Sequence, residues 1–285
     1  MSTLQKDRGE ILVFYILMGV VGYDSYLRFA DWSIELRFLA ADLVMMMIAF
    51  LLSLYKRNSS VYDAYWSVIP FYFMLVFYFE STEWNAHQWV YAGLVSGWSW
   101  RLTYNWYRSW SGWSHEDWRY VNYRNQMGKS FIWMNFFGLH LYPTLIVFAS
   151  MLGMFSVLLP TTSTHSIVFP IGAGIAGIGI ALEFFADNTL HQHRKEAAGT
   201  RSDVLRKGLW KYSRNPNYLG EMLFWCGLAL MGFAWGAVWW TGLGAIGMIA
   251  MFLFASIPMK EARLKETKGE AFEKYMREVP RILPF

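Results

Sequence analysis

Long apolar segments are the feature that most constrains the fold of this chain. A helix needs about 20 mostly apolar residues to cross a bilayer. Eight candidate spans follow one another, at residues 11–29, 37–55, 62–80, 88–107, 131–158, 167–187, 219–234 and 237–258. The last two form one apolar stretch, which we expect to fold as a hairpin near Trp235–Gly236. The fifth holds Pro143, which predicts a tilt or a kink. The sequence therefore predicts an all-α, polytopic membrane bundle of seven or eight transmembrane helices.

The composition agrees with a membrane protein. Charged residues make up 16% of the chain and aromatic residues 19%, whereas a soluble domain carries about 25% charged residues. The single cysteine, Cys226, excludes an intrachain disulfide and a cysteine-based metal site. The first apolar run lacks a small-residue cleavage site, so we interpret it as a span and not as a signal peptide. We expect no nucleic-acid partner and no required oligomer.

Positive charges alternate from loop to loop. Lys and Arg lie before the first span, after the second, and between the fourth and fifth. More lie between the sixth and seventh spans, among them Lys195, Arg201, Arg206, Lys207, Lys211 and Arg214. The loops after the third, fifth and seventh spans carry none. The positive-inside rule then puts both termini in the cytoplasm, and we expect one domain over residues 1–285.

Ionisable residues inside spans are functional candidates. The clearest set closes the sixth span, and its members fall within about an 80° arc of one helical face: Glu183, Asp187, His191 and Arg194. They form either a polar seam that pairs with neighbouring helices or one wall of a cytoplasm-facing polar pocket. We favour the pocket.

The segment Ser213–Gly220 places a second polar group at the start of an apolar helix. Pro216 suits the first helical turn, with Asn215 as its cap. Four polar side chains then share a face within about a 100° arc: Arg214, Asn217, Tyr218 and Glu221. A helix N-terminus with an adjacent arginine is a ready anion site, most simply for phosphate. An ordinary cap with a snorkelling arginine explains Arg214 and Asn215, but not Glu221.

Two weaker clusters lie earlier in the chain. The cytoplasmic loop "SHEDWRYVNYRNQMGKS" places Glu116, Asp117, Arg119, Tyr120 and Arg124 close together, with Trp118 among them. Asp63 lies within the predicted third span, where it shares a face with Trp66 and Pro70. Arg101, near the inner end of the fourth span, is a natural counter-charge. Asp63 and Arg101 form either a structural pair or part of a site.

Other motifs are missing. The six histidines show no metal-ligand spacing apart from His191 and His193, which point to different sides of a helix, so we expect no metal. No G-x-G-x-x-G pattern follows a strand and no Walker motif is present, so a nucleotide cofactor would be bound in a non-Rossmann way.

The segment "GLWKYSRNPNYLGEMLFWCGLAL" resembles the C-terminal signature of the membrane steroid 5α-reductase family. That signature reads Gly-Leu-Trp, an aromatic residue, Arg-His-Pro-Asn-Tyr, one residue and Gly-Glu; here Asn215 replaces the histidine. "ADNTLHQHRKEA" resembles the family's Asp and Arg segment, and "SHEDWRY" the Glu-Asp-x-Arg-Tyr loop of its bacterial branch. The tail "SIPMKEARLKETKGEAFEKYMREVPRILPF" is also similar. The match covers most of residues 60–285, so we interpret 1–60 as N-terminal spans and 61–285 as the catalytic core.

The resemblance implies an NADPH-dependent reductase of the C=C bond of an enone, such as a 3-oxo-Δ4-steroid. The family holds its cofactor between membrane helices and cytoplasmic loops. The cofactor-binding residues we expect are Arg101, Asp117, Arg119, Tyr120, Asp187, His191, Arg194, Arg214, Asn215, Asn217, Tyr218, Glu221 and Glu261. Arg119, Arg194 and Arg214 are the candidates for its phosphates.

In the animal enzymes a carboxylate and a Tyr hold the 3-oxo group. The carboxylate position falls at Asp63, and the Tyr position falls at Trp98, which cannot act as a comparable acid; Tyr104 and Tyr65 are the candidate substitutes. Hydride addition to an enone develops negative charge on the carbonyl oxygen, which needs a donor in a dry site. We therefore expect Asp63 to be that acid, or to orient a tyrosine that is.

Two alternatives belong to other classes. Membrane methyltransferases of the isoprenylcysteine or phospholipid type share an Arg-His-Pro-x-Tyr segment and a late glutamate, and use S-adenosylmethionine. The intact Asn-Tyr-x-Gly-Glu run and the Asp187–Arg194 pair favour the reductase. A transporter or lipid-binding protein would need an outward path, which the short outer loops do not offer. A sterol, another flat terpenoid enone and a fatty enoyl chain would each fit an apolar pocket between spans.

Overall fold

The computed structural model describes residues 2–81, 83–159, 166–196 and 204–283, and every regular element within them is a helix. Arg201 of the predicted inner loop and Pro284 and Phe285 of the tail lie outside these residues. The chain divides into two compact units, Met1–Phe148 and Ala149–Phe285. The predicted single domain over residues 1–285 stays a prediction, and so does the predicted boundary at residue 60 between the N-terminal spans and the catalytic core.

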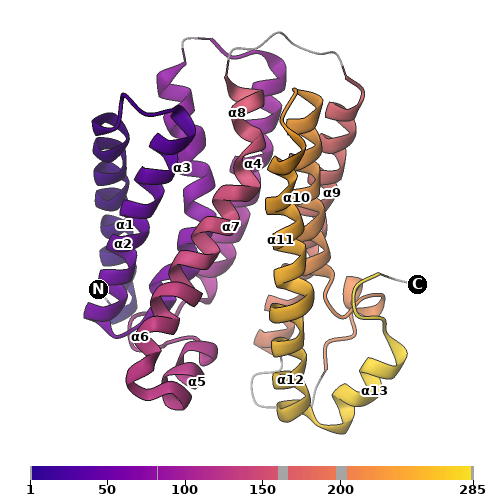
Figure 1. Ribbon diagram of the computed structural model, residues 1–285. Coiled ribbons are helices and arrows are strands. Elements are labelled where there is room, and N and C mark those ends of the chain that lie inside the picture. Colours follow the sequence, from indigo (N-terminus) through magenta and orange to yellow (C-terminus); the bar gives the residue numbers. More distant parts are fainter. Residues whose placement is uncertain (1, 82, 160–165, 197–203, 284–285) are drawn as a thin grey trace. The chain divides into compact units, whose positions relative to one another are not determined.

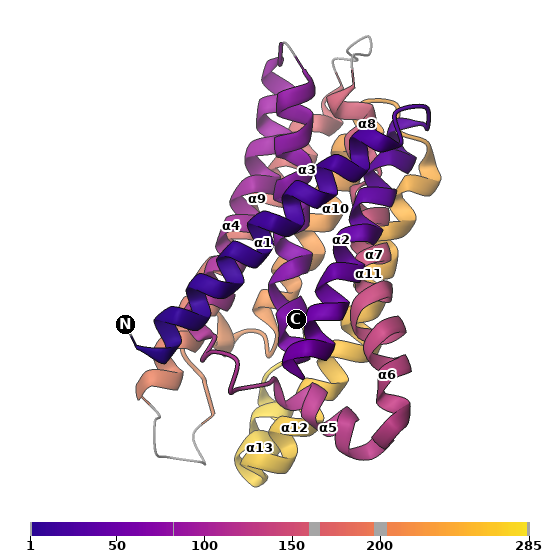
Figure 2. The ribbon, with the colours of Figure 1, turned by 90° about the vertical axis from the view of Figure 1, so that its left-hand side faces the viewer.

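The first unit is built from helices that pack in sequential pairs. α1 runs obliquely and turns back into α2 (Figure 2), and α3 packs against α4 in the same way. Aromatic rings from α1, α2 and α3 fill the space between the helices, with Phe38 in contact with Tyr26, Phe73 and Phe77. Its elements are α1 (Thr3–Arg28), α2 (Ile34–Lys56), η1 (Ser59–Ala64), α3 (Tyr65–Glu80), α4 (Ala86–Ser109), α5 (Trp118–Met127), η2 (Gly128–Ser130), α6 (Phe131–Trp133), η3 (Met134–Leu141) and α7 (Tyr142–Met151), whose last turn belongs to the second unit.

The second unit is arranged around α10. This helix packs against α8, α9 and α11, and Figure 1 shows α9, α10 and α11 side by side. Its elements are α8 (Gly153–Leu158), α9 (Val168–Glu196), η4 (Gly208–Lys211), α10 (Pro216–Ala234), η5 (Trp239–Gly242), α11 (Leu243–Met251), η6 (Phe252–Ser256), α12 (Ile257–Lys268) and α13 (Glu270–Glu278).

All eight apolar segments are largely helical in the described residues. Five helical stretches are long and apolar enough to cross a membrane: Thr3–Arg28, Ile34–Lys56, Trp118–Leu158, Val168–Glu196 and Trp239–Lys268. The protein is therefore an integral membrane protein. The count of seven or eight spans and the cytoplasmic placement of both termini stay predictions.

The predicted hairpin after the seventh segment is confirmed. α10 ends at Ala234, and Gly236 adopts a left-handed conformation with φ +82°. The Gly236 N–H donates to the Phe233 carbonyl at 3.1 Å, and the Ala237 N–H donates to the Gly232 carbonyl at 3.0 Å. These two bonds satisfy the last carbonyls of the helix, and the glycine takes a backbone angle that other residues adopt at a cost.

The fifth segment is irregular just before its proline. Met134–Leu141 forms a π-helical stretch, η3, and Pro143 follows in the first turn of α7. Proline has no N–H and its ring crowds the preceding turn, so a regular α-helical ladder cannot pass through it. The wider π turn accommodates that break.

Glycines allow α9 and α10 to approach very closely. A Cβ atom on Gly179 would lie 2.5 Å from the Gly220 carbonyl oxygen and 2.8 Å from the Phe224 nitrogen. A Cβ atom on Gly220 would lie 2.6 Å from the Gly179 carbonyl oxygen. Small residues of this kind let helix backbones meet inside a membrane.

We expect Gly179→Ala to destabilise the protein by about 1–3 kcal/mol, because the methyl group meets backbone atoms that cannot move aside independently. Gly177→Ala is the matched control, since a Cβ there meets nothing within 4 Å, and alanine at an open helical site should stabilise by up to about 1 kcal/mol. Thermal unfolding in detergent measures both. Equal melting temperatures for the two variants would contradict the close α9–α10 contact.

Candidate active site

Asp63 lies in a short helical turn at the foot of α3. The sequence places it inside the third predicted span, at residues 62–80; in the structure it belongs to η1, directly before α3 begins at Tyr65. Asn58 caps η1, with its Oδ1 accepting from the Ser60 N–H at 2.9 Å. The turn therefore fixes the Asp63 backbone outside the five long helical stretches.

Two side chains of α5 contact the Asp63 carboxylate. The Tyr120 hydroxyl donates a hydrogen bond to Asp63 Oδ1. Arg119 Nη2 lies 3.6 Å from the same oxygen, and the Asp63 side chain is 19% exposed. The cation beside Asp63 is thus Arg119 of α5, whereas the sequence suggests Arg101, which is buried on α4.

Burial raises the pKa of Asp63 to about 6. The Arg119 charge opposes this shift, the Asp117 charge adds to it, and hydrogen bonds from Tyr120 and Ser60 lower the pKa. Desolvation of the carboxylate outweighs its partners. Asp63 is therefore a carboxylic acid that can hold its proton close to neutral pH.

The start of α5 explains why Arg119 and Tyr120 point to Asp63. Asp117 is the N-cap of α5, and its Oδ1 accepts from the Arg119 N–H at 2.9 Å and from Arg119 Nε at 2.7 Å. The cap satisfies a free N–H of the first turn. It also fixes the guanidinium next to the phenol, and Tyr120 is buried.

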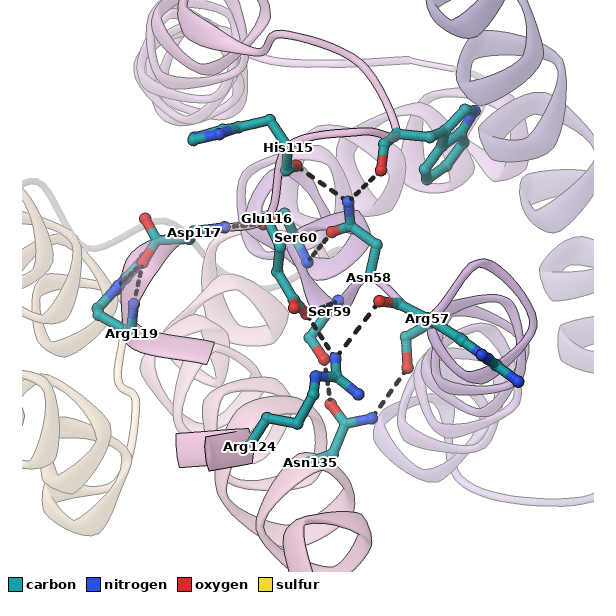
Figure 3. A network of polar contacts seen from close by, with 12 residues as sticks. Arg57, Asn58, Ser59, Ser60, His115, Glu116, Asp117, Arg119, Arg124 and Asn135 are labelled. Carbon is teal, nitrogen blue, oxygen red and sulfur yellow. Dashed lines mark hydrogen bonds and ion pairs between the residues drawn. The ribbon is translucent and has the colours of Figure 1, made fainter. Parts of the chain in front are cut away.

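A network of hydrogen bonds joins the loop before α5 to Asn58, Ser59 and Ser60, and we call this network the clasp (Figure 3). Asn58 Nδ2 donates to two loop carbonyls at 3.0 Å, and the Asp117 N–H donates to Ser60 Oγ at 2.8 Å. Glu116 Oε1 accepts from the Ser59 N–H and from Arg124 Nη2, both at 2.7 Å. The Glu-Asp-x-Arg-Tyr loop, a weak signal in the sequence, is thus bonded to the turn that carries Asp63. Asn58 and Ser60 are not singled out by the sequence, although they stand in "RNSSVYD" just before Asp63.

The other predicted catalytic residues have different surroundings. The Tyr65 hydroxyl donates to the carbonyl and to Oδ1 of Asp42, both at 2.7 Å. Tyr104 is 55% exposed, and Trp98 is fully buried within α4. The phenol that the structure brings to Asp63 is Tyr120, which the sequence assigns to the cofactor instead.

The second unit contains a buried ionic centre at Glu261. Its Oε1 accepts from Arg214 Nε at 2.9 Å and from Asn215 Nδ2 at 3.4 Å. Its Oε2 accepts from Arg281 Nε at 3.1 Å, with Arg281 Nη2 at 3.0 Å. Arg214 Nη1 also donates to the carbonyls of Met276 and Val279, at 2.9 and 2.6 Å. Glu261 and Arg214 therefore fasten the C-terminal segment to the start of α10.

Asn215 occupies the predicted N-cap position of α10, with Pro216 in the first turn. Its side chain does not cap the helix, and this part of the prediction is wrong. The amide instead donates to Glu261 and to the Arg281 carbonyl, while its Oδ1 accepts from Lys260 Nζ at 2.9 Å. The tail provides partners that outcompete the local cap.

Lys260 is a further cation that sequence reasoning does not identify. Its ammonium lies over the rings of Trp210 and Tyr218, at 4.7 and 5.0 Å from their centroids. It interacts electrostatically with Arg194 and Asp187 on α9. The one sequence feature that points to Lys260 is its position next to Glu261 in the motif "PMKEA".

Asp187 and Asn217 meet between α9 and α10. Asn217 Nδ2 lies 3.5 Å from Asp187 Oδ1, and Asn217 Oδ1 is buried without a hydrogen-bond partner among the described residues. Glu183 and Glu221 are buried on the same two helices, and His191 is half-buried one turn beyond Asp187. A buried acceptor of this kind favours a ligand that carries an N–H or O–H group.

Within the described ranges, no group of three or more His, Cys, Asp and Glu side chains is placed to hold a metal ion.

These features define an all-helical integral membrane protein with a partly buried acid in one unit and a cluster of cations, amides and carboxylates in the other. The chain belongs to the family described as "Protein of unknown function (DUF1295)", whose model matches residues 49–279. This is the steroid 5α-reductase-like family.

Several known proteins are similar to the chain. It is 26% identical over 229 residues to an uncharacterized protein of Schizosaccharomyces pombe, over 70% of this chain and 65% of the relative. It is 39% identical over 70 residues to steroid 5-alpha-reductase DET2 of Solanum lycopersicum, over 25% of this chain and 26% of that protein. It is 32% identical over 117 residues to human 3-oxo-5-alpha-steroid 4-dehydrogenase 1, over 41% of each chain. The matches thus span 65%, 26% and 41% of these relatives. No solved structure matches.

Proposed function

We propose that this protein reduces the C=C bond of a lipophilic enone, such as a 3-oxo-Δ4-steroid, with NADPH. The observation that carries the proposal is the partly buried acid at Asp63, bonded to Tyr120, in a chain whose named relatives are steroid reductases. The relatives do not favour the methyltransferase alternative.

The residues of the second unit fit NADPH. Lys260 and Arg194 supply positive charge for phosphate groups, with Lys260 between two aromatic rings. Asp187 can accept from ribose hydroxyls, and the unpartnered Asn217 Oδ1 can accept from an amide N–H. Arg214 shapes this region through Glu261, since its Nε and Nη1 already donate to the chain. Of the other predicted ligands, five belong to the second unit, on or next to α9, α10 and α12: His191, Asn215, Tyr218, Glu221 and Glu261. Arg101, Asp117, Arg119 and Tyr120 belong to the first unit, and their roles as cofactor ligands stay predictions.

The chemistry requires an acid aimed at the substrate carbonyl. NADPH, when bound, supplies a hydride for the β-carbon of the enone. The π electrons of the C=C bond then move toward the carbonyl oxygen, giving an enolate, and Asp63 stabilises the developing negative charge by donating a hydrogen bond. Protonation of the α-carbon by water completes the addition of one hydride and one proton. Asp63 can donate only in its protonated form, which its raised pKa of about 6 makes accessible.

A binding and turnover assay tests the proposal. We expect the purified protein in detergent to enhance NADPH fluorescence and to oxidise NADPH when given a 3-oxo-Δ4-steroid, with a product two mass units heavier. S-adenosylmethionine should not bind. A panel of terpenoid enones and fatty enoyl thioesters then ranks the substrate classes.

A pair of lysine variants provides the control. Lys260→Met should raise the Kd for NADPH about tenfold or more, since a partly desolvated cation next to phosphate contributes at least ~1.4 kcal/mol. Lys274→Met, at a side chain that is 69% exposed, should leave the Kd unchanged. Binding of S-adenosylmethionine without NADPH binding would contradict the reductase proposal.

A further inference from the structure

The contact between Tyr120 and Asp63 bears directly on how the acid operates. These residues are 57 positions apart in the sequence, yet the phenol donates to the carboxylate oxygen inside the first unit. Tyr120 is 6% exposed, whereas the Asp63 side chain retains 19% exposure. The pair therefore has a protected side, formed by Tyr120, and an accessible side where a ligand can reach the carboxyl group.

The number of protons in this pair decides what it can do. When Asp63 is ionised, the pair holds one proton, on the phenol, and that proton is used in the hydrogen bond to Oδ1. When Asp63 is protonated, the pair holds two. One joins the two residues, and the second is free to bond an external oxygen. A carbonyl oxygen can therefore be bound only by the doubly protonated pair.

We propose that Tyr120 is a positioning residue that acts through Asp63, with which it forms a two-proton acid whose free proton binds the carbonyl oxygen of the substrate. This assignment rests on the proposed enone reduction. As charge develops on the substrate oxygen, the Asp63 proton shifts toward it. The Tyr120 hydrogen bond to Oδ1 then stabilises the negative charge that appears on the carboxylate. When the α-carbon takes its proton from water, the shared proton returns to Asp63 and the pair is restored.

The surrounding groups hold this pair in place. On the α5 side, Arg119 lies 3.6 Å from Asp63 Oδ1 and Asp117 fixes the guanidinium. On the α1 side, the Tyr15 hydroxyl donates to the Val61 carbonyl at 2.6 Å, so it holds its own proton. Glu116 and Arg124 neutralise each other within the clasp. Arg119 and Asp117 are therefore the charged groups that act with Tyr120 on the proton affinity of Asp63.

Tyr120→Phe tests the assignment. We expect kcat to fall about 100-fold, as for loss of one donor to a developing oxyanion, with an unchanged Kd for NADPH. The Tyr120 hydrogen bond lowers the pKa of Asp63, so its removal should move the alkaline limb of the pH–rate profile to higher pH. Tyr55→Phe, which removes a phenol from a residue that is 81% exposed, is the control and should match wild type. A Tyr120→Phe enzyme with wild-type kcat and an unmoved limb would overturn the assignment.

A spectroscopic measurement tests the pair without turnover. With 3-fluorotyrosine at position 120, we expect a fluorine resonance that titrates with a midpoint near pH 6, the pKa of Asp63, and that stops titrating in Asp63→Asn. A resonance insensitive to Asp63 would overturn the pair. A wild-type protein that reduces no enone would overturn the proposed function and this assignment with it. An active wild type beside an equally active Tyr120→Phe would overturn this assignment alone.

Discussion

Asp63→Asn is expected to lower kcat for enone reduction by about 1,000-fold, because an amide N–H is a much weaker acid than a carboxylic acid. Wild-type kcat should fall about tenfold per pH unit above the Asp63 pKa of about 6, since only the protonated carboxyl can donate. The asparagine variant does not titrate there, so its residual rate should be flat with pH. Stopped-flow measurement of NADPH oxidation from pH 5 to 9 would record both profiles.

Stability provides a check that the Asp63 variant is folded. The pKa of Asp63 is higher in the folded protein than the ordinary carboxyl value. At a pH between these two pKa values, the folded state therefore binds more protons than the unfolded state. The free energy of unfolding therefore falls as pH rises through that window, and the ionised carboxylate is unfavourable above it. Asp63→Asn should consequently unfold no earlier than wild type at pH 8.

Asp31→Asn, at an exposed residue of the α1–α2 connection, is the matched control and should retain wild-type kcat. Full turnover by Asp63→Asn, with NADPH still bound, would remove Asp63 from the mechanism.

Glu261→Ala is expected to destabilise the protein by about 3–5 kcal/mol, as when one partner of a buried ion pair is removed. The Arg214 side chain is 8% exposed and would lose its carboxylate partner, Glu261. Arg281 and Asn215 would lose an acceptor as well. The segment after α13 should then detach from the start of α10.

Thermal unfolding in detergent and proteolysis of the C-terminal segment measure this effect. Glu266→Ala on the same helix is the matched control, because its pair with Arg263 is exposed and such pairs contribute about 0–1 kcal/mol. Glu261→Gln should fall between the two, since the amide retains an acceptor for Asn215 but loses the charge. If Glu261→Ala and Glu266→Ala unfolded alike, the buried ionic centre would not stabilise the second unit.

Much of the fold could be predicted because it depends on local properties. Apolar content over about 20 residues favours a helix wherever the segment lies. Gly236 ends α10 through its own backbone conformation, and Pro216 begins that helix because its fixed φ suits a first turn. The stripe of Glu183, Asp187, His191 and Arg194 follows from helical periodicity alone, since α9 continues to Glu196.

For the site, the sequence indicates which residues take part but not which residues they contact. The sequence indicates Asp63, Tyr120, Arg214 and Asn217 as candidates, but it does not indicate their partners. Arg214 and the start of α10 suggested an anion site, yet the guanidinium bonds to Glu261, 47 residues further on. Asn215 suggested a cap, yet its amide bonds to the tail. A local preference worth about 1 kcal/mol gives way when tertiary packing supplies a buried charged partner.

The sequence by itself determined where helices form, where they break and which side chains are too polar for their apolar surroundings. Only the tertiary structure decided that the phenol beside Asp63 is Tyr120 and not Tyr65 or Tyr104. The physical reason is the separation along the sequence between the residues that interact. Helix formation and termination depend on neighbours within a few residues, whereas a hydrogen bond requires two atoms within about 3 Å. For Asp63 and Tyr120 that proximity depends on how α5 and its clasp fold back onto η1.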